Sequence, residues 1–262
     1  MILRIVGSSP SMPRPGGACS CYLVLSREAA VLLDVGSGAF AKLQLALEYP
    51  RLDAIVISHM HADHFFDLVP FRYALKYGPL LRNEPLPLWL PPGGRAALDA
   101  LRRAVAVDAP QAFFDSVYAV SEYQPSQTLR VRDLRLTFSR TRHYVEAYAV
   151  RAESDGASIT YSADTAPCDG VVDLAAGTSL FLCEAALGLG TEEGIRGHSS
   201  AQEAGAMAER AGALRLVLTH YGAADEPGAL VEAAKSYFGG SVAVASDGDQ
   251  LSVFGSSLGS EN

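Results

Sequence analysis

The six histidines of the chain gather in and around segments that could bind metal ions. Three stand in one short run, and Asp63 lies directly before the last of them. Side chains two residues apart in an extended segment point the same way, so His59 and His61 should face one point. The turn that follows lets Asp63 and His64 face a second point nearby. Because zinc, manganese and iron accept imidazole and carboxylate ligands, the run predicts a site for two metal ions.

Three further candidate ligands stand at the ends of later predicted strands. The apolar segment 53–57, directly before the histidine run, also has the pattern of a buried strand, so strand ends would carry the whole site. Taken alone, Asp164 is better explained as a turn or helix-capping residue. With seven candidates converging, metal coordination becomes the better interpretation. The expected ligands are His59, His61, Asp63, His64, His143, Asp164 and His220.

His198 is the histidine left without a metal. It precedes a helix that Ser200 and Glu203 should open as a capping box. Since the N-terminus of a helix favours anionic groups, His198 is a candidate for binding substrate and for giving a proton to a leaving group. The alternative is that His198 only leads into the helix.

Arginines are dense between residues 130 and 142. Leu134, Leu136 and Phe138 alternate with polar residues there, and an ordinary half-solvated strand explains most of this charge. Only Arg142, next to His143, is kept as a candidate for binding a substrate phosphate.

Composition limits the class of protein. The 262 residues carry a net charge of -8 and 49% of them are apolar. These values favour a folded protein with a large core over a disordered chain or a nucleic-acid coat. The first apolar run is too short for a secretory signal, and no run of about eighteen apolar residues occurs, so we expect a soluble cytoplasmic protein.

The four cysteines show no disulfide or zinc-ribbon spacing, and Cys19 with Cys21 would make an incomplete metal site.

Hydrophobic periodicity predicts an opening run of antiparallel strands, followed by strands and helices in alternation. Predicted strands cover residues 2–6, 22–25, 31–33, 53–57, 87–90, 113–120, 134–138, 147–150, 158–161, 180–183, 214–218 and 242–245. Predicted helices cover residues 37–49, 65–77, 95–104, 200–210 and 226–238. Two mixed sheets with outer helices fit this order.

The motif order resembles the metallo-β-lactamase superfamily: His59-x-His61-x-Asp63-His64, then His143, Asp164 and His220. The resemblance covers essentially the whole chain. It implies an α/β fold, the four-layer αββα sandwich, formed by residues 1–262 as a single domain. It also implies that His59, His61 and His143 hold one metal and that Asp63, His64 and His220 hold the other, with Asp164 bridging.

Segments 161–165, 183–185 and 198–204 are similar to the ribonuclease Z-like phosphodiesterases. In that branch a Glu/His pair assists catalysis, and the resemblance carries this role to Glu184 and His198. From the residues alone, the alternative is that Glu184 is a solvated strand end. Only residues 144–163 separate His143 from Asp164, which leaves no room for the long arm that grips tRNA in the tRNA-processing enzymes. The layout is closer to a compact mycobacterial type that degrades cyclic nucleotides, although Ala163 and Ala201 replace two glycines.

The sequence therefore predicts a dinuclear, metal-dependent phosphodiesterase acting on a small cyclic phosphodiester such as 3′,5′-cyclic AMP. Two metal ions about 3.5–4 Å apart can lower the pKa of a shared water to near neutrality and neutralise charge on a phosphoryl oxygen. Asp63 could orient or deprotonate the resulting hydroxide. Zinc is the expected metal, with manganese and iron as alternatives.

Other functions stay open at this point: a ribonuclease Z-like nuclease acting on RNA, a thioesterase or lactonase of the same fold, and a non-enzymatic, metal-stabilised interaction module. The acidic charge and the missing arm disfavour long RNA as a partner. A thioesterase or lactonase would not need the His198/Glu184 pair. Many relatives of this kind are dimers, so a homodimer is compatible with the resemblance, although the sequence shows no interface signature.

Overall fold

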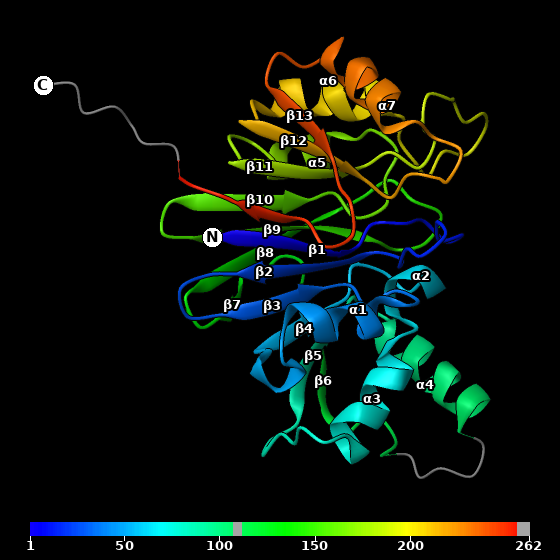
Figure 1. Cartoon of the computed structure of the whole chain (residues 1–262), viewed down its shortest axis with the longest axis vertical. Coiled ribbons are helices and arrows are strands. Elements are labelled where there is room, and N and C mark those ends of the chain that lie inside the picture. Colours follow the sequence, from blue (N-terminus) through cyan, green and yellow to red (C-terminus); the bar gives the residue numbers. More distant parts are fainter. Residues whose placement is uncertain (107–111, 256–262) are drawn as a thin grey trace, which may run out of the picture.

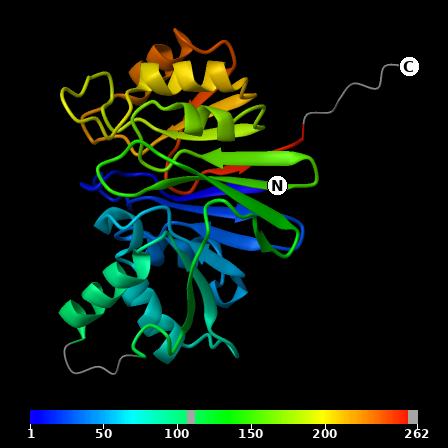
Figure 2. The ribbon, with the colours of Figure 1, turned by 180° about the vertical axis from the view of Figure 1, so that it is seen from behind.

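A computed structural model describes residues 1–106 and 112–255 of the chain. They form two seven-stranded sheets with helices on the outer side of each sheet (Figure 1). The view from behind in Figure 2 agrees that the two groups of helices lie at opposite ends of the molecule, with the sheets between them. The predicted α/β architecture of two mixed sheets with outer helices is confirmed. The predicted single domain also includes residues 107–111 and 256–262, which lie outside the described residues.

The first sheet has the strand order β14-β1-β2-β3-β4-β5-β6. Its strands are β1 (Ile2–Gly7), β2 (Cys21–Leu25), β3 (Ala30–Leu33), β4 (Ala54–Val56), β5 (Leu86–Leu90), β6 (Tyr118–Glu122) and β14 (Gln250–Ser252). The helices that follow its strands are α1 (Ala39–Ala46), the short 3-10 helix η1 (Tyr49–Arg51), α2 (Ala62–Phe65), α3 (Leu68–Tyr77) and α4 (Gly94–Val105). The predicted antiparallel opening is confirmed, because β2 pairs antiparallel with both β1 and β3.

The second sheet has the order β13-β12-β11-β10-β9-β8-β7. Its strands are β7 (Leu129–Val131), β8 (Leu134–Arg140), β9 (Tyr148–Ser154), β10 (Ala157–Tyr161), β11 (Leu180–Glu184), β12 (Arg215–Thr219) and β13 (Ser241–Val244). Its helices are α5 (Asp169–Leu174), α6 (Ala201–Ala211) and α7 (Pro227–Lys235). In the described part of the chain, no helix has both the length and the apolar character needed to cross a membrane.

Three apolar clusters hold these layers together. In the middle one, inward-facing side chains of both sheets interlock, for example Leu3 and Val31 with Leu136 and Ile159. The other two clusters lie between each sheet and its own helices. Both faces of β10 are covered by other layers. All of its residues are therefore buried, and its burial pattern is continuous rather than alternating.

Several predicted elements differ in extent from the observed ones, and two of them have an identifiable cause. The strand expected at 113–120 begins only at Tyr118, because Phe113 and Phe114 precede it in turns and pack among the helices. The helix expected at 65–77 is two helices that meet around Asp67, whose carboxylate accepts a hydrogen bond from the backbone N–H of Phe40 at 2.8 Å. No periodic pattern predicted α5, β7 or β14, which are too short to show a clear period.

Candidate metal centre

Strand direction brings the predicted ligands together. The strands β10, β11 and β12 are mutually parallel, and β8 runs the same way because both β8 and β10 pair antiparallel with β9. Their carboxyl ends therefore share one edge of the second sheet. Backbone hydrogen bonds join this edge to the first sheet, from His220 N to Ser8 O at 2.9 Å and from Tyr148 N to Ser58 O at 3.1 Å. The histidine run after β4 thus meets the strand ends of the other sheet.

The first cluster contains His59, His61, His143 and Asp164. His61 Nδ1 lies 3.1 Å from His59 Nε2 and 3.0 Å from His143 Nε2. One oxygen of Asp164, Oδ2, lies 3.7 Å from His59 Nε2 and 3.8 Å from His143 Nε2. Ligand atoms around a tetrahedral zinc ion, each about 2.0–2.1 Å from the metal, lie roughly 3.3 Å from one another. The spacing of these four donors matches a metal site.

Protonation also suits the first cluster. Burial lowers the pKa of His59, His61 and His143 below the usual value for imidazole. The neutral ring leaves one nitrogen with a free lone pair, which is the form that binds a metal ion.

The second cluster contains Asp63, His64, His220 and the same Asp164. His64 Nε2 lies 3.5 Å from Asp63 Oδ2 and 3.4 Å from Asp164 Oδ1. His220 Nε2 lies 3.7 Å from Asp63 Oδ2 and 3.5 Å from Asp164 Oδ2. Asp164 therefore faces both clusters at once, in the place of a bridging ligand.

Two buried atoms in the second cluster show that a cation fits. His64 Nε2 and Asp164 Oδ1 are buried and have no hydrogen-bond partner in the structure. A buried polar atom without a partner costs about 1–3 kcal/mol, so natural proteins rarely leave one unpaired. A divalent ion held by the two clusters would satisfy both atoms with ligands of the type that zinc, manganese and iron accept.

Asp34 supports the centre, and we did not identify it from the sequence. It follows β3, is fully buried, and accepts hydrogen bonds from His64 Nδ1 at 2.8 Å and from the Tyr161 hydroxyl at 3.0 Å. It also accepts hydrogen bonds from the backbone N–H and hydroxyl of Ser58, at 2.7 and 2.8 Å. With Nδ1 of His64 donating to Asp34, Nε2 is left as the metal-binding atom. In the sequence, Asp34 stands directly after a predicted strand, as the metal ligands do, and this position could have identified it.

Other imidazoles are oriented in the same manner. His143 Nδ1 donates to the carbonyl oxygen of Gly197 at 2.7 Å, and His220 Nδ1 lies 2.9 Å from the hydroxyl of Ser20. In each ring the second nitrogen, Nε2, faces the clusters. These partners fix the ring rotation as well as the tautomer.

Backbone strain is concentrated at the centre. Asp34, Ala163 and His220 have φ values of 59°, 51° and 57°, in the left-handed region that residues other than glycine rarely adopt. Such conformations cost about 1–2 kcal/mol each and persist where surrounding contacts impose them. At all three positions the chain turns sharply after a strand and thereby aims a side chain into the centre.

The structure also brings Glu184 and His198 together. His198 Nδ1 lies 2.9 Å from Glu184 Oε1. Glu184 is fully buried, and its carboxylate accepts backbone hydrogen bonds from Thr165 and Ala186, both at 2.8 Å. A solvated strand end therefore does not describe Glu184. Burial alone would lower the pKa of His198, but its hydrogen bond to Glu184 and the charge of that carboxylate raise the pKa to about 9.

A cavity of about 480 Å³, the metal-site pocket, opens onto both clusters. Its size falls within the range of about 300–1,000 Å³ typical of small-molecule sites. It is lined by Pro10, Ser11, His61, Ala62, Asp63, Tyr144, Asp164, Ala186, Leu187, His198 and His220. Arg142 is exposed and is not among them, so its role in binding a phosphate stays a prediction.

Cys19 and Cys21 belong to none of the groups of described residues that could hold a metal ion. Burial raises the pKa of the Cys19 thiol to about 11, and burial also raises the pKa of Cys21 well above its usual value. Cys19 instead donates a hydrogen bond to the carbonyl oxygen of Pro10 at 3.2 Å. Both thiols therefore stay protonated at neutral pH.

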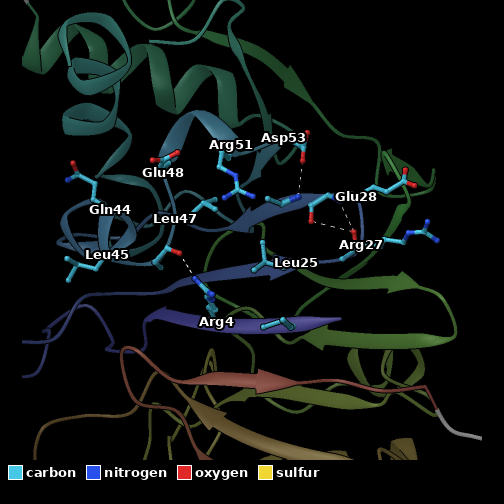
Figure 3. Close-up of a pocket in the computed structure, with 15 residues that line it drawn as sticks. Arg4, Leu25, Arg27, Glu28, Gln44, Leu45, Leu47, Glu48, Arg51 and Asp53 are labelled. Carbon is cyan, nitrogen blue, oxygen red and sulfur yellow. Dashed lines mark hydrogen bonds between the residues drawn. The ribbon is translucent and has the colours of Figure 1, made fainter. Parts of the chain in front are cut away.

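A larger hollow of about 580 Å³ lies at the opposite ends of β1, β2 and β3 (Figure 3). Its lining includes Arg4, Arg51 and Asp53, charges of both signs. It contains no histidine, and the described residues around it form none of the metal-binding groups. The metal-site pocket is therefore the candidate site of the reaction.

Comparison with known proteins agrees with this geometry. A family model described as the beta-lactamase superfamily domain matches residues 30–221. The chain belongs to the beta-lactamase superfamily. It is 29% identical over 253 residues to the probable metallo-hydrolase YhfI of Bacillus subtilis, a match that covers 95% of this chain and 98% of YhfI. The crystal structure of YhfI superposes with a TM-score of 0.85 at 27% identity, covering 95% of this chain and 98% of that one.

Two mycobacterial proteins are also similar to the chain. The uncharacterized protein Rv1339 of Mycobacterium tuberculosis is 30% identical over 250 residues, covering 92% of this chain and 88% of Rv1339. A ribonuclease Z of Mycobacterium bovis is 27% identical over 245 residues, covering 86% of this chain and 88% of the ribonuclease. With these relatives and its two His/Asp clusters, this superfamily member is a metal-dependent hydrolase that binds divalent metal. The predicted likeness to the ribonuclease Z branch is confirmed.

Proposed function

We propose that this hydrolase is a phosphodiesterase that uses two zinc ions to cleave a small phosphodiester such as 3′,5′-cyclic AMP. The observation that carries the proposal is the hydrogen bond between the buried Glu184 and His198, with His198 lining the same pocket as both clusters. Phosphodiester cleavage expels an alkoxide that needs a proton, and a histidine beside the metal ligands can supply it.

The residues divide into three tasks. The seven ligands in the two clusters would hold the ions, which when bound would lower the pKa of a shared water and neutralise charge on a phosphoryl oxygen. Asp63 lines the pocket and can orient the attacking water through its carboxylate. His198, aligned by Glu184, would donate a proton to the leaving oxygen.

Size and charge favour a small substrate. The metal-site pocket has a volume of about 480 Å³, and none of the described side chains that line it belongs to lysine or arginine. Between His143 and Asp164 the chain forms only a loop and the hairpin of β9 and β10, without an arm. Together with the net charge of -8, these features disfavour a long polyanion such as RNA.

A substrate panel tests the proposal. The zinc-loaded protein would be assayed against 3′,5′-cyclic AMP, 2′,3′-cyclic phosphates, bis(p-nitrophenyl) phosphate, pre-tRNA and a thioester, with Asp164→Asn as the control for contaminating activity. We expect turnover of the small diesters and none by the Asp164→Asn protein. Turnover confined to pre-tRNA or to the thioester would contradict the proposal. Metal binding without hydrolysis of any diester would indicate an interaction module instead.

A further inference from the structure

Tyr144 forms an aromatic wall of the metal-site pocket. Its side chain is 48% exposed, although it is large and apolar and stands directly after a metal ligand. The ring centroid lies 5.0 Å from that of His143 and 5.6 Å from that of His198. The ring therefore lines the pocket beside both a metal ligand and His198.

The ring is held in place from two sides. Its hydroxyl donates a hydrogen bond to Oε1 of Glu192, while Oε2 of the same carboxylate accepts hydrogen bonds from Gly197 N at 2.7 Å and His198 N at 3.2 Å. The ring also packs against Gly197, where an added Cβ would lie 2.5 Å from two ring carbons, closer than non-bonded carbon atoms approach. Tyr144 is therefore a positioned wall, since the loop that carries His198 also fixes its ring.

The chemistry around this wall suits a flat apolar group. Pro10, Ala186 and Leu187 line the pocket with Tyr144, and none of the described lining residues is a lysine or arginine that could bind a second phosphate. Among the described residues that line the pocket, the charged groups are those of the metal centre and His198. A substrate that fits both parts has one diester at the centre and an uncharged ring beside it.

We propose that Tyr144 determines specificity by stacking against an aromatic substituent of the phosphodiester, a nucleobase or an aryl group. Glu192 accepts the hydrogen bond of the Tyr144 hydroxyl, and contact with Gly197 supports the ring itself. The proposal rests on the phosphodiesterase function proposed above and adds the class of substituent that the enzyme selects. It predicts that the base contributes to recognition independently of the metal centre.

The test compares substrates with and without a base. For Tyr144→Ala we expect kcat/KM for 3′,5′-cyclic AMP to fall roughly 5- to 150-fold, the range for loss of one base–aromatic stack, mainly through KM. For ribose 3′,5′-cyclic phosphate, which has no base, kcat/KM should change less than about twofold, because no stack is lost. Tyr144→Phe keeps the ring and should retain most of the base preference. Tyr237→Ala, which removes an exposed tyrosine away from the pocket, should leave both substrates unaffected.

Two outcomes would overturn the role of Tyr144. Equal losses on both substrates would make it a structural residue, and unchanged kcat/KM for cyclic AMP would show that no base stacks there. If the wild-type protein hydrolyses neither substrate, the phosphodiesterase proposal fails. Titration calorimetry with metal-loaded protein then tests base stacking separately, through binding affinities. Adenosine 5′-monophosphate should then bind at least about fivefold tighter than ribose 5-phosphate, and Tyr144→Ala should remove the difference. Equal binding of the two compounds to wild-type protein would overturn the proposal that Tyr144 stacks against a base.

Discussion

At the residue scale, the centre depends on atoms that orient the ligands as much as on the ligands. Each buried imidazole has one nitrogen facing the clusters, and Asp34, Gly197 or Ser20 fixes the other in His64, His143 and His220. A histidine without such a partner can rotate or change tautomer, which weakens metal binding.

We expect Asp34→Asn to weaken the second metal site. The amide keeps the shape of the side chain but loses the charge that pairs with His64 Nδ1, and loss of such a partner reduces metal affinity about 10- to 100-fold. Competition with a chromogenic chelator measures this affinity. Asp133→Asn is the matched control, because Asp133 also accepts two side-chain hydrogen bonds but lies away from the clusters. Equal affinity in Asp34→Asn and wild type would show that Asp34 does not orient the ligand.

His198→Ala should lower kcat for 3′,5′-cyclic AMP about 10²- to 10⁴-fold, the usual contribution of a general acid. The loss should be much smaller for bis(p-nitrophenyl) phosphate, because p-nitrophenolate leaves without needing a proton. Glu184→Gln should follow the same substrate pattern more weakly. Metal analysis of each purified variant serves as the control, since none of the seven ligands is altered. A similar loss on both substrates would contradict proton donation by His198.

At the scale of the elements, α6 connects stability with the site. Ser200 Oγ accepts a hydrogen bond from Glu203 N at 3.4 Å, and Glu203 Oε2 accepts one from Ser200 N at 3.0 Å, which forms the predicted capping box. The helix begins at Ala201, three residues after His198. Its N-terminus therefore fixes the direction in which the chain carrying His198 enters the pocket.

Ser200→Ala should reduce the free energy of unfolding by about 1 kcal/mol, because the first turn of α6 loses its cap. Urea denaturation would show a lower midpoint with an unchanged slope. Ser236→Ala, at an exposed hydroxyl that donates to Glu232 O near the end of α7, should change the midpoint little. A midpoint in Ser200→Ala equal to that of wild type would show that the capping box does not stabilise the protein.

At the scale of the whole molecule, the centre joins the two sheets. The histidine run follows β4 of the first sheet, whereas His143, Asp164 and His220 follow strands of the second. Ligands from both sheets would share each metal ion. Metal binding should therefore oppose separation of the layers as well as support chemistry.

Metal removal should lower the melting temperature. A ligand that binds only the folded state at 100 times its Kd stabilises by about 2.7 kcal/mol, which corresponds to roughly 5–10 °C for a chain of this size. Differential scanning calorimetry of zinc-loaded and chelator-treated protein measures the shift. His198→Ala should keep the shift, and Asp164→Asn should lose most of it. A melting temperature independent of metal would contradict the expectation that bound metal holds the two sheets together.

Much of the fold was predictable because it depends on local patterns. Apolar runs such as 53–57 and 180–183 predicted buried strands, and Ser200 with Glu203 predicted the start of α6. Errors arose where contacts distant in sequence prevail, as at Asp67, which caps the start of α1 and interrupts the helix expected at 65–77. Short elements such as α5 carry too few residues for a periodic signal.

The sequence alone determined the family pattern and the residue types of the metal centre. Few kinds of side chain bind these metals, and their spacing along the chain is the motif of the family. The tertiary structure decided which atoms meet. Only the parallel direction of β8, β10 and β12 places His143, Asp164 and His220 at one edge, opposite the run from the other sheet. Asp34 behind His64, Glu184 behind His198 and Tyr144 on Gly197 are contacts between segments far apart along the chain. Local preferences cannot encode them, because each depends on how both sheets pack.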